Sequence, residues 1–259
     1  MEVWQSGLMR LIRNQVRAKP SAGSNPAASA NTLRRTMRNR TAQLILQSAY
    51  CALGIVAIFA SFGFFDYNYN PNWYVYFTHL SNYMCFGIML AELIQTAKRN
   101  GDGYVSVSPF LKFFGLCFIL LTGIAFNVML ADGRPASDNF ALNSVLMHIV
   151  LPILFCVDWI LFYQHRQVKV TWPLFTLIPL TIYIAMIFFR ASAFGFDSEH
   201  YILYPYFFLD LDKNGIVGVE LWCCILAGAY TLFAYAMYGL DCLLRRWTKS
   251  REEKFPILP

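Results

Sequence analysis

Six long apolar stretches, separated by short polar segments, follow one another along the chain from residue 42 onward. Each approaches or exceeds the roughly 20 residues that a helix needs to cross the hydrocarbon core of a membrane. We place these spans at Ala42–Phe65, Trp73–Thr96, Phe110–Leu130, Asn143–Tyr163, Trp172–Phe189 and Ile216–Leu240. Because the connections are too short to hold a soluble domain, the pattern predicts an all-α polytopic membrane protein, a bundle of six transmembrane helices.

The composition agrees with this pattern. Hydrophobic residues make up 57% of the chain and charged residues only 14%, whereas a soluble domain carries about 25% charged residues. The loops 66–72 and 194–215 are poor in Lys and Arg, and positive charge gathers at the opposite helix ends. Its carriers are Lys98, Arg99, Lys112, Arg166, Lys169, Arg245, Arg246, Lys249, Arg251 and Lys254. The positive-inside rule therefore predicts that both termini are cytoplasmic.

Residues 1–36 differ from the rest of the chain because they are basic and have no apolar run of signal-peptide length. Permissible codons for Arg10–Val16 contain a stem and loop with the form of a tRNA anticodon arm, and those for Gly23–Pro26 resemble a tRNA T-arm. We therefore expect a non-native leader, its start assigned inside an upstream tRNA gene, with translation beginning near Met37. The alternative is a genuine, disordered basic tail.

Without those 36 residues the formal net charge falls from +6 to +1, since they hold six basic residues and one acidic residue. The basic pI then gives no indication of nucleic acid as a partner, and we expect none. Residues 37–244 are predicted to form the transmembrane domain. Residues 245–259 are predicted to form a basic cytoplasmic tail at the membrane surface.

Two polar residues inside apolar spans stand out, Thr78 and His148. The hydrocarbon has no water to satisfy such groups, so they usually face a bundle interior, pair with each other or do chemistry. Thr78 lies five residues into the second span, roughly 8 Å along a helix, and His148 lies at a similar depth in the fourth span. The predicted topology therefore places both in one layer near the outer face.

Other polar residues are expected near this layer. Asn82 follows Thr78 by one helical turn, and Ser144 precedes His148 by one turn, so each pair shares a helix face. The remaining candidates for binding, oxyanion or orienting roles are Asn127, Arg190, Tyr204 and Glu220. The seven cysteines and four histidines have no metal-binding spacing, so we expect neither a metal nor another cofactor.

A purely structural interpretation exists for each candidate. Thr78 can bond to its own helix, and His148, Asn82 and Asn127 can hold helices together. Arg190 can extend to lipid headgroups, and Glu220 suits a helix start because the helix dipole favours an acid there. Asp158 lies ten residues beyond His148, about 15 Å away, and with Glu92 is expected to be structural.

Three short segments together resemble the bacterial six-helix Pr-six-Pr membrane proteins. They are Phe77-Thr78-x-x-Ser81-Asn82, then Asn143 to His148 with Pro152 and Asp158-Trp159, then Tyr204-Pro205-Tyr206-x-Phe208-Leu209-Asp210. The resemblance runs from about Met37 to Leu244. These bacterial proteins are distant relatives of the eukaryotic androgen-induced and androgen-dependent membrane hydrolases. The resemblance implies a multi-pass protein of the bacterial inner membrane.

In the eukaryotic relatives a membrane threonine and a histidine are implicated in hydrolysing fatty acid esters of hydroxy fatty acids. The resemblance matches the threonine to Thr78 and the histidine to His148. The spacing from this histidine to the next proline is one residue shorter here, and Phe207 replaces a second proline of the tyrosine-proline signature. The resemblance thus implies the fold and the residue pair, and leaves the substrate open.

Two further hypotheses compete with a threonine hydrolase that attacks long-chain esters entering from membrane lipid. The first is a carrier of lipids or small molecules, with the polar layer as its binding site and a water-accessible path through the bundle. The second is a scaffold, with the polar residues on unrelated faces. The hydrolase predicts a one-sided pocket with Thr78 and His148 in contact. The distance between these two side chains distinguishes the three hypotheses.

Overall fold

The computed structural model describes the backbone of residues 26–65, 67–99, 106–130, 140–165, 167–193 and 201–254. It also describes their side chains, except those of residues 26–39, 130 and 246–254. The leader residues 1–25, Arg166 and the last five tail residues lie outside this range. Residues 40–259 form one compact unit, to which all the contacts below belong. The described chain is helical and contains no strand, so the all-α prediction is confirmed for this part.

The helices follow the predicted order. The long ones are α2 (Pro26–Ser61), α3 (Phe77–Lys98), α4 (Pro109–Ala125), α7 (Leu151–Phe162), α9 (Leu177–Ala193) and α10 (Leu211–Lys254). Two single-turn helices, α6 (Leu142–Val145) and α8 (Trp172–Phe175), precede α7 and α9. A 3-10 turn, η3 (Phe207–Leu209), precedes α10. Two π-helical turns, η1 (Phe126–Leu130) and η2 (Leu146–Val150), extend α4 and join α6 to α7.

Five helical segments within the described residues are long and apolar enough to cross a membrane. They are Arg40–Ser61, Pro109–Met129, Leu142–Phe162, Trp172–Ala193 and Leu211–Arg245. The second predicted span corresponds to α3, which is 22 residues long but carries more polar residues. Those that are buried include Thr78, His79, Ser81, Asn82 and Glu92. The structure thus supports a multi-pass membrane protein.

Gly215 divides the last helix. Its φ of 64° and ψ of 174° lie in a region that is open almost only to glycine. The continuous helix therefore begins at Ile216, where the sequence predicts the sixth span to start. Residues before this break connect η3 to the span.

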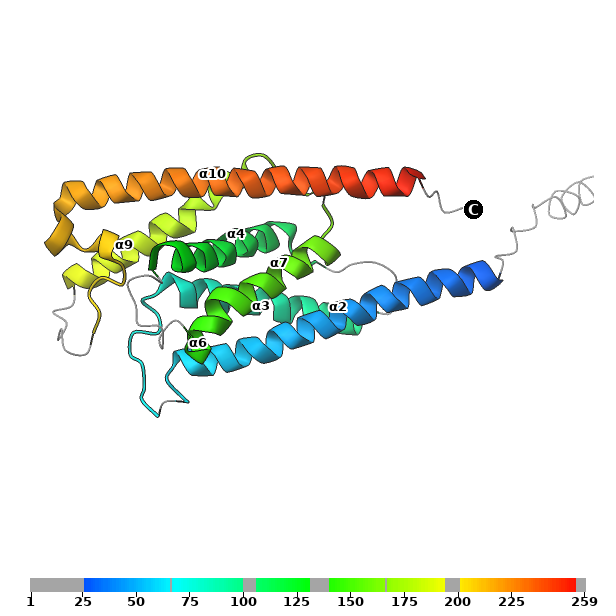
Figure 1. Ribbon diagram of the computed structural model, residues 1–259, viewed down its shortest axis with the longest axis horizontal. Helices are drawn as coiled ribbons and strands as arrows, with labels where there is room; N and C mark the ends of the chain where they lie inside the picture. Colours follow the sequence, from blue (N-terminus) through cyan, green and yellow to red (C-terminus); the bar gives the residue numbers. More distant parts are fainter. Residues whose placement is uncertain are drawn as a thin grey trace, which may run out of the picture. The chain divides into compact units, whose positions relative to one another are not determined.

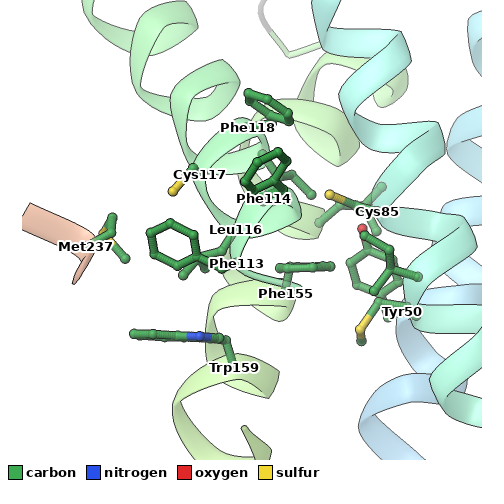
Figure 2. Packing of buried hydrophobic residues seen from close by; sticks show 14 of the residues in the cluster. Tyr50, Cys85, Phe113, Phe114, Leu116, Cys117, Phe118, Phe155, Trp159 and Met237 are labelled. Carbon is green, nitrogen blue, oxygen red and sulfur yellow. The ribbon is translucent and has the colours of Figure 1, made fainter. Parts of the chain in front are cut away.

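Aromatic packing around α4 holds the bundle together. Figure 1 shows α4 between α10 and α7, and α4 also packs along α3. In the core, Met237 of α10, Phe113 of α4, Phe155 of α7 and Tyr50 of α2 belong to one buried cluster (Figure 2). Such large rings pack tightly where their edges meet the faces of neighbours, as Tyr50 does with Phe155 at 5.9 Å.

A buried ion cluster joins three helices beside this core. Lys112 of α4 is only 1% exposed, and its Nζ lies 2.7 Å from Glu92 Oε2 of α3 and 2.6 Å from Asp158 Oδ2 of α7. The Nζ also sits 4.3 Å above the centre of the Phe155 ring. The sequence places Lys112 among the charges that flank a loop, whereas the structure makes it the cation that compensates two buried acids.

Candidate active site

The local helix geometry brings Thr78 and His148 together. Because α3 begins at Phe77 rather than at Trp73, Thr78 lies in the first helical turn, where backbone N–H groups have no intrahelical partner. His148 lies inside the π-helical turn η2. Leu151 N–H bonds there to Leu146 O, five residues back, which widens the turn. Single π-helical turns within α-helices occur frequently at functional sites.

Thr78 and His148 are in contact. The Thr78 Oγ1 lies 3.4 Å from His148 Nε2, and Thr78 is buried. The other ring nitrogen, Nδ1, lies 3.0 Å from the backbone oxygen of Ser144, which can only accept a hydrogen bond. The Ser144 hydroxyl also lies 3.4 Å from Nδ1. A proton on Nδ1 satisfies the carbonyl, and in that tautomer Nε2 presents its lone pair to the threonine hydroxyl. This tautomer is the one that a general base requires.

Phe126 fixes the plane of the imidazole. Its ring, in η1, stacks on His148 with 3.7 Å between the centroids and 10° between the planes. Gly123, one turn earlier in the same helix, allows this approach. A Cβ at position 123 would lie 3.0 Å from the backbone oxygen of His148. The two π-helical turns thus pack against each other directly behind the base.

Tyr206 supplies a third polar group at the pair. Its hydroxyl accepts the backbone N–H of Phe77 at 3.1 Å and is a hydrogen-bond partner of the Thr78 side chain. Burial raises the pKa of Tyr206 to about 12, so its hydroxyl keeps its proton at neutral pH and can donate. Tyr206 is not among the site residues predicted from the sequence. Its place in the tyrosine-proline signature is the signal that points to it.

The two asparagines do not donate into the site. The Asn82 Nδ2 donates to Thr78 O at 2.8 Å and to Met147 O at 3.2 Å, so both its hydrogens are used. Asn82 therefore ties α3 to η2 and fixes the distance between Thr78 and His148. Asn127 is exposed, and its Nδ2 donates to Gly123 O of its own helix at 2.7 Å. Asn82 therefore has no free donor for an oxyanion, and Asn127 does not line the cavity beside Thr78.

Arg190 and Tyr204 belong to a neighbouring cluster that holds the loop carrying Tyr206. The buried Arg190 donates to Ile202 O at 2.6 Å and to the Tyr74 hydroxyl at 3.1 Å. Tyr204 is partly buried and packs near Phe188, with 6.3 Å between ring centroids. Arg190 thus acts on the site only through the position of this loop.

Glu220 does not orient the imidazole. It lies exposed on α10 and forms no hydrogen bond or ion pair with the residues that the structure describes. The group that orients His148 is the Ser144 carbonyl, which a sequence cannot distinguish from any other backbone oxygen. The Ser144 carbonyl, in α6, therefore occupies the orienting position for which Glu220 was a candidate.

An apolar cavity of about 350 Å³ opens beside Thr78. This volume lies within the usual range for small-molecule sites. Its walls come from α4, η1, α9, η3 and α10, and they include Ala125, Met129, Ile184, Leu226 and Phe233. Thr78 and Tyr206 both line it, whereas His148 lies behind Thr78, outside the lining. Within the described residues there is no group of three or more His, Cys, Asp or Glu side chains that could hold a metal ion.

Comparison with protein-family models, with curated proteins and with solved structures finds no match to this chain.

Proposed function

We propose that this membrane protein is a hydrolase of lipid esters, with Thr78 as nucleophile and His148 as general base. The observation that carries the proposal is the contact between Thr78 Oγ1 and His148 Nε2, with Nδ1 held by the Ser144 carbonyl. An unassisted threonine hydroxyl is a weak nucleophile at neutral pH and needs such a base. The 3.4 Å separation is longer than a strong hydrogen bond, and catalytic contacts commonly shorten when substrate binds.

In the proposed reaction the Thr78 hydroxyl gives its proton to His148 Nε2 and attacks the ester carbonyl carbon. The tetrahedral oxyanion forms at the amino end of α3, where the helix dipole favours negative charge. Tyr206 donates to the same oxygen. The imidazolium then protonates the departing alcohol, and water, deprotonated by His148, releases the acid from Thr78.

The cavity favours a lipid as the substrate. It is lined almost entirely by apolar side chains and ends at the one nucleophilic hydroxyl that has a base behind it. The partial exposure of its wall at Ile124, Val128 and Met129 gives an acyl chain a sideways route from the bilayer. A carrier would require a water-accessible path, whereas the lining of this cavity is almost entirely apolar, which favours the hydrolase. The resemblance to the membrane threonine hydrolases points to the same chemistry.

We also propose that α3 crosses the membrane as the second of six spans, in an inner membrane with both termini cytoplasmic. Its polar residues Thr78, Ser81, Asn82 and Glu92 are buried, so they face the bundle rather than lipid. The polar layer with Thr78 and His148 then lies near the outer face.

Ester hydrolysis by the purified protein tests the proposed hydrolase activity directly. Thr78→Ala and His148→Ala are each expected to lower hydrolysis of a p-nitrophenyl ester by at least about a thousandfold, because either change removes the activated nucleophile. Thr181→Ala is the matched control, since its hydroxyl also lines the cavity but donates to Leu177 O of its own helix. Full activity in the Thr78→Ala protein, with the fold intact by circular dichroism, would refute the proposal.

A further inference from the structure

The backbone oxygen of Met147 is an acceptor that the π-helical turn η2 leaves to another helix. In an α-helix each N–H bonds to the carbonyl four residues back, so Leu151 would serve Met147. In η2 the Leu151 N–H bonds to Leu146 O instead, five residues back. The five-residue spacing would assign Met147 O to residue 152, which is proline and has no N–H. Neither spacing therefore gives Met147 O a donor from its own helix.

Asn82 of α3 supplies the donor to Met147 O. Its Nδ2 donates to Met147 O at 3.2 Å and to Thr78 O at 2.8 Å. One side-chain amide therefore joins the backbone of the nucleophile to the residue that precedes the base. Asn82 is 2% exposed and Met147 is 1% exposed, so water does not compete for these hydrogen bonds. The 3.4 Å between Thr78 Oγ1 and His148 Nε2 is set across this bridge.

We propose that Pro152 is a positioning residue for the reaction of Thr78 and His148. Because it has no N–H, it leaves Met147 O to Asn82 and so holds the base against the nucleophile. Pro152 lies two residues beyond η2 and does not line the cavity beside Thr78, so it acts on the pair through the helix backbone. The catalytic part of this inference rests on the proposed function. The bridge through Asn82 does not, and it can be measured without turnover.

An N–H at position 152 would change the turn in one of two ways. In the π-helical pattern it bonds to Met147 O and competes with Asn82. In the α-helical pattern it bonds to His148 O, and the Leu151 N–H returns to Met147 O. The turn then loses its additional residue, which rotates His148 by about 100° relative to α7, the angle that one residue occupies in an α-helix. Both arrangements weaken the bridge, and the second also turns the imidazole away from the nucleophile.

Two variants that differ only in this N–H test the role of Pro152. Pro152→Ala adds the N–H, whereas lactic acid incorporated at position 152 has the same side chain but an ester oxygen in place of the N–H. Pro152→Ala should lower kcat for a p-nitrophenyl ester at least about tenfold and leave KM nearly unchanged, because the pair is misplaced while the cavity is not. The lactic acid variant should stay within about twofold of the unchanged protein.

Pro179→Ala is the matched control for the loss of a proline ring. Pro179 is the third residue of α9, and an N–H in the first turn of a helix has no intrahelical partner. It does not line the cavity, so this variant should keep full activity. Circular dichroism should show the same helix content in all three variants.

Unfolding in detergent measures the bridge in protein that need not turn over. Asn82→Ala should lower the midpoint of unfolding, and in the Pro152→Ala background this loss should shrink to about half, because Met147 O then has a donor from its own helix. In the Pro179→Ala background the loss should stay complete. An equal loss in all backgrounds would overturn the inference, as would equal hydrolysis by the alanine and lactic acid variants. A halved loss together with hydrolysis that survives Thr78→Ala would refute only the proposed function.

Discussion

The site is built from a few residues whose neighbours decide what they can do. His148 can act as a base because the Ser144 carbonyl accepts a hydrogen bond from Nδ1–H and Phe126 fixes the ring plane. Thr78 was recognisable from the sequence as a polar residue in an apolar span. Tyr206 was not assigned a role, because it lies 128 residues away and reaches Thr78 only through the fold of the loop before α10.

The role of Tyr206 can be tested by removing its hydroxyl alone. Tyr206→Phe should lower kcat roughly 10- to 100-fold and leave KM nearly unchanged, since the lost hydrogen bond forms mainly in the transition state. Because burial raises the pKa of this tyrosine to about 12, the hydroxyl stays protonated between pH 7 and 10. The ratio of kcat in the unchanged protein to kcat in Tyr206→Phe should therefore be constant over this range. Tyr204→Phe is the control, and a ratio that reaches one below pH 10 would contradict this role.

Helix packing depends on groups that bind several elements at once. Lys112 connects α4 to Glu92 of α3 and Asp158 of α7, and the three side chains are almost fully buried. The free-energy penalty of removing these charges from water offsets much of their mutual attraction. The cluster therefore contributes more to fixing the relative positions of the helices than to net stability. It also sets the distance between the helices that carry Thr78 and His148.

Removing the lysine alone should therefore lower the free energy of unfolding more than removing the whole cluster. Lys112→Met leaves two buried carboxylates without a counter-charge and should lower the free energy of unfolding by about 3–5 kcal/mol. The triple variant Lys112→Met, Glu92→Leu, Asp158→Leu should recover most of this loss. Lys213→Met, which breaks an ion pair at a 77% exposed lysine, should cost less than about 1 kcal/mol. Denaturation in detergent measures all three, and a single and triple variant of equal stability would contradict the argument.

At the scale of the whole molecule, the number of spans decides where the two ends lie. Six spans place both termini on one side of the membrane, and five place them on opposite sides. The deciding helix is α3, whose polar residues lower its hydropathy although the bundle buries them. Hydropathy averages over all faces of a helix, so it underestimates a span whose polar face is turned inward.

Reporter fusions distinguish the two arrangements. Green fluorescent protein should fluoresce at both the amino and the carboxyl terminus, and alkaline phosphatase inserted between Tyr67 and Asn72 should be active, because its disulfides form only outside the cytoplasm. Phosphatase activity at exactly one terminus would show an odd number of spans. A fusion after Lys169, on the expected cytoplasmic side, is the control that should fluoresce.

The sequence alone determined the helical class and the order of the apolar helices, and it predicted a common depth for Thr78 and His148. These follow from hydropathy and from 1.5 Å of rise per residue, which are local properties that add along the chain. Only the tertiary structure decided that the two side chains touch, that Tyr206 joins them, that Glu220 is exposed and that Lys112 is buried. Those outcomes depend on how each helix is rotated about its axis and on where π-helical turns widen it. Both the rotation and the widening are decided by packing against side chains from distant segments of the chain.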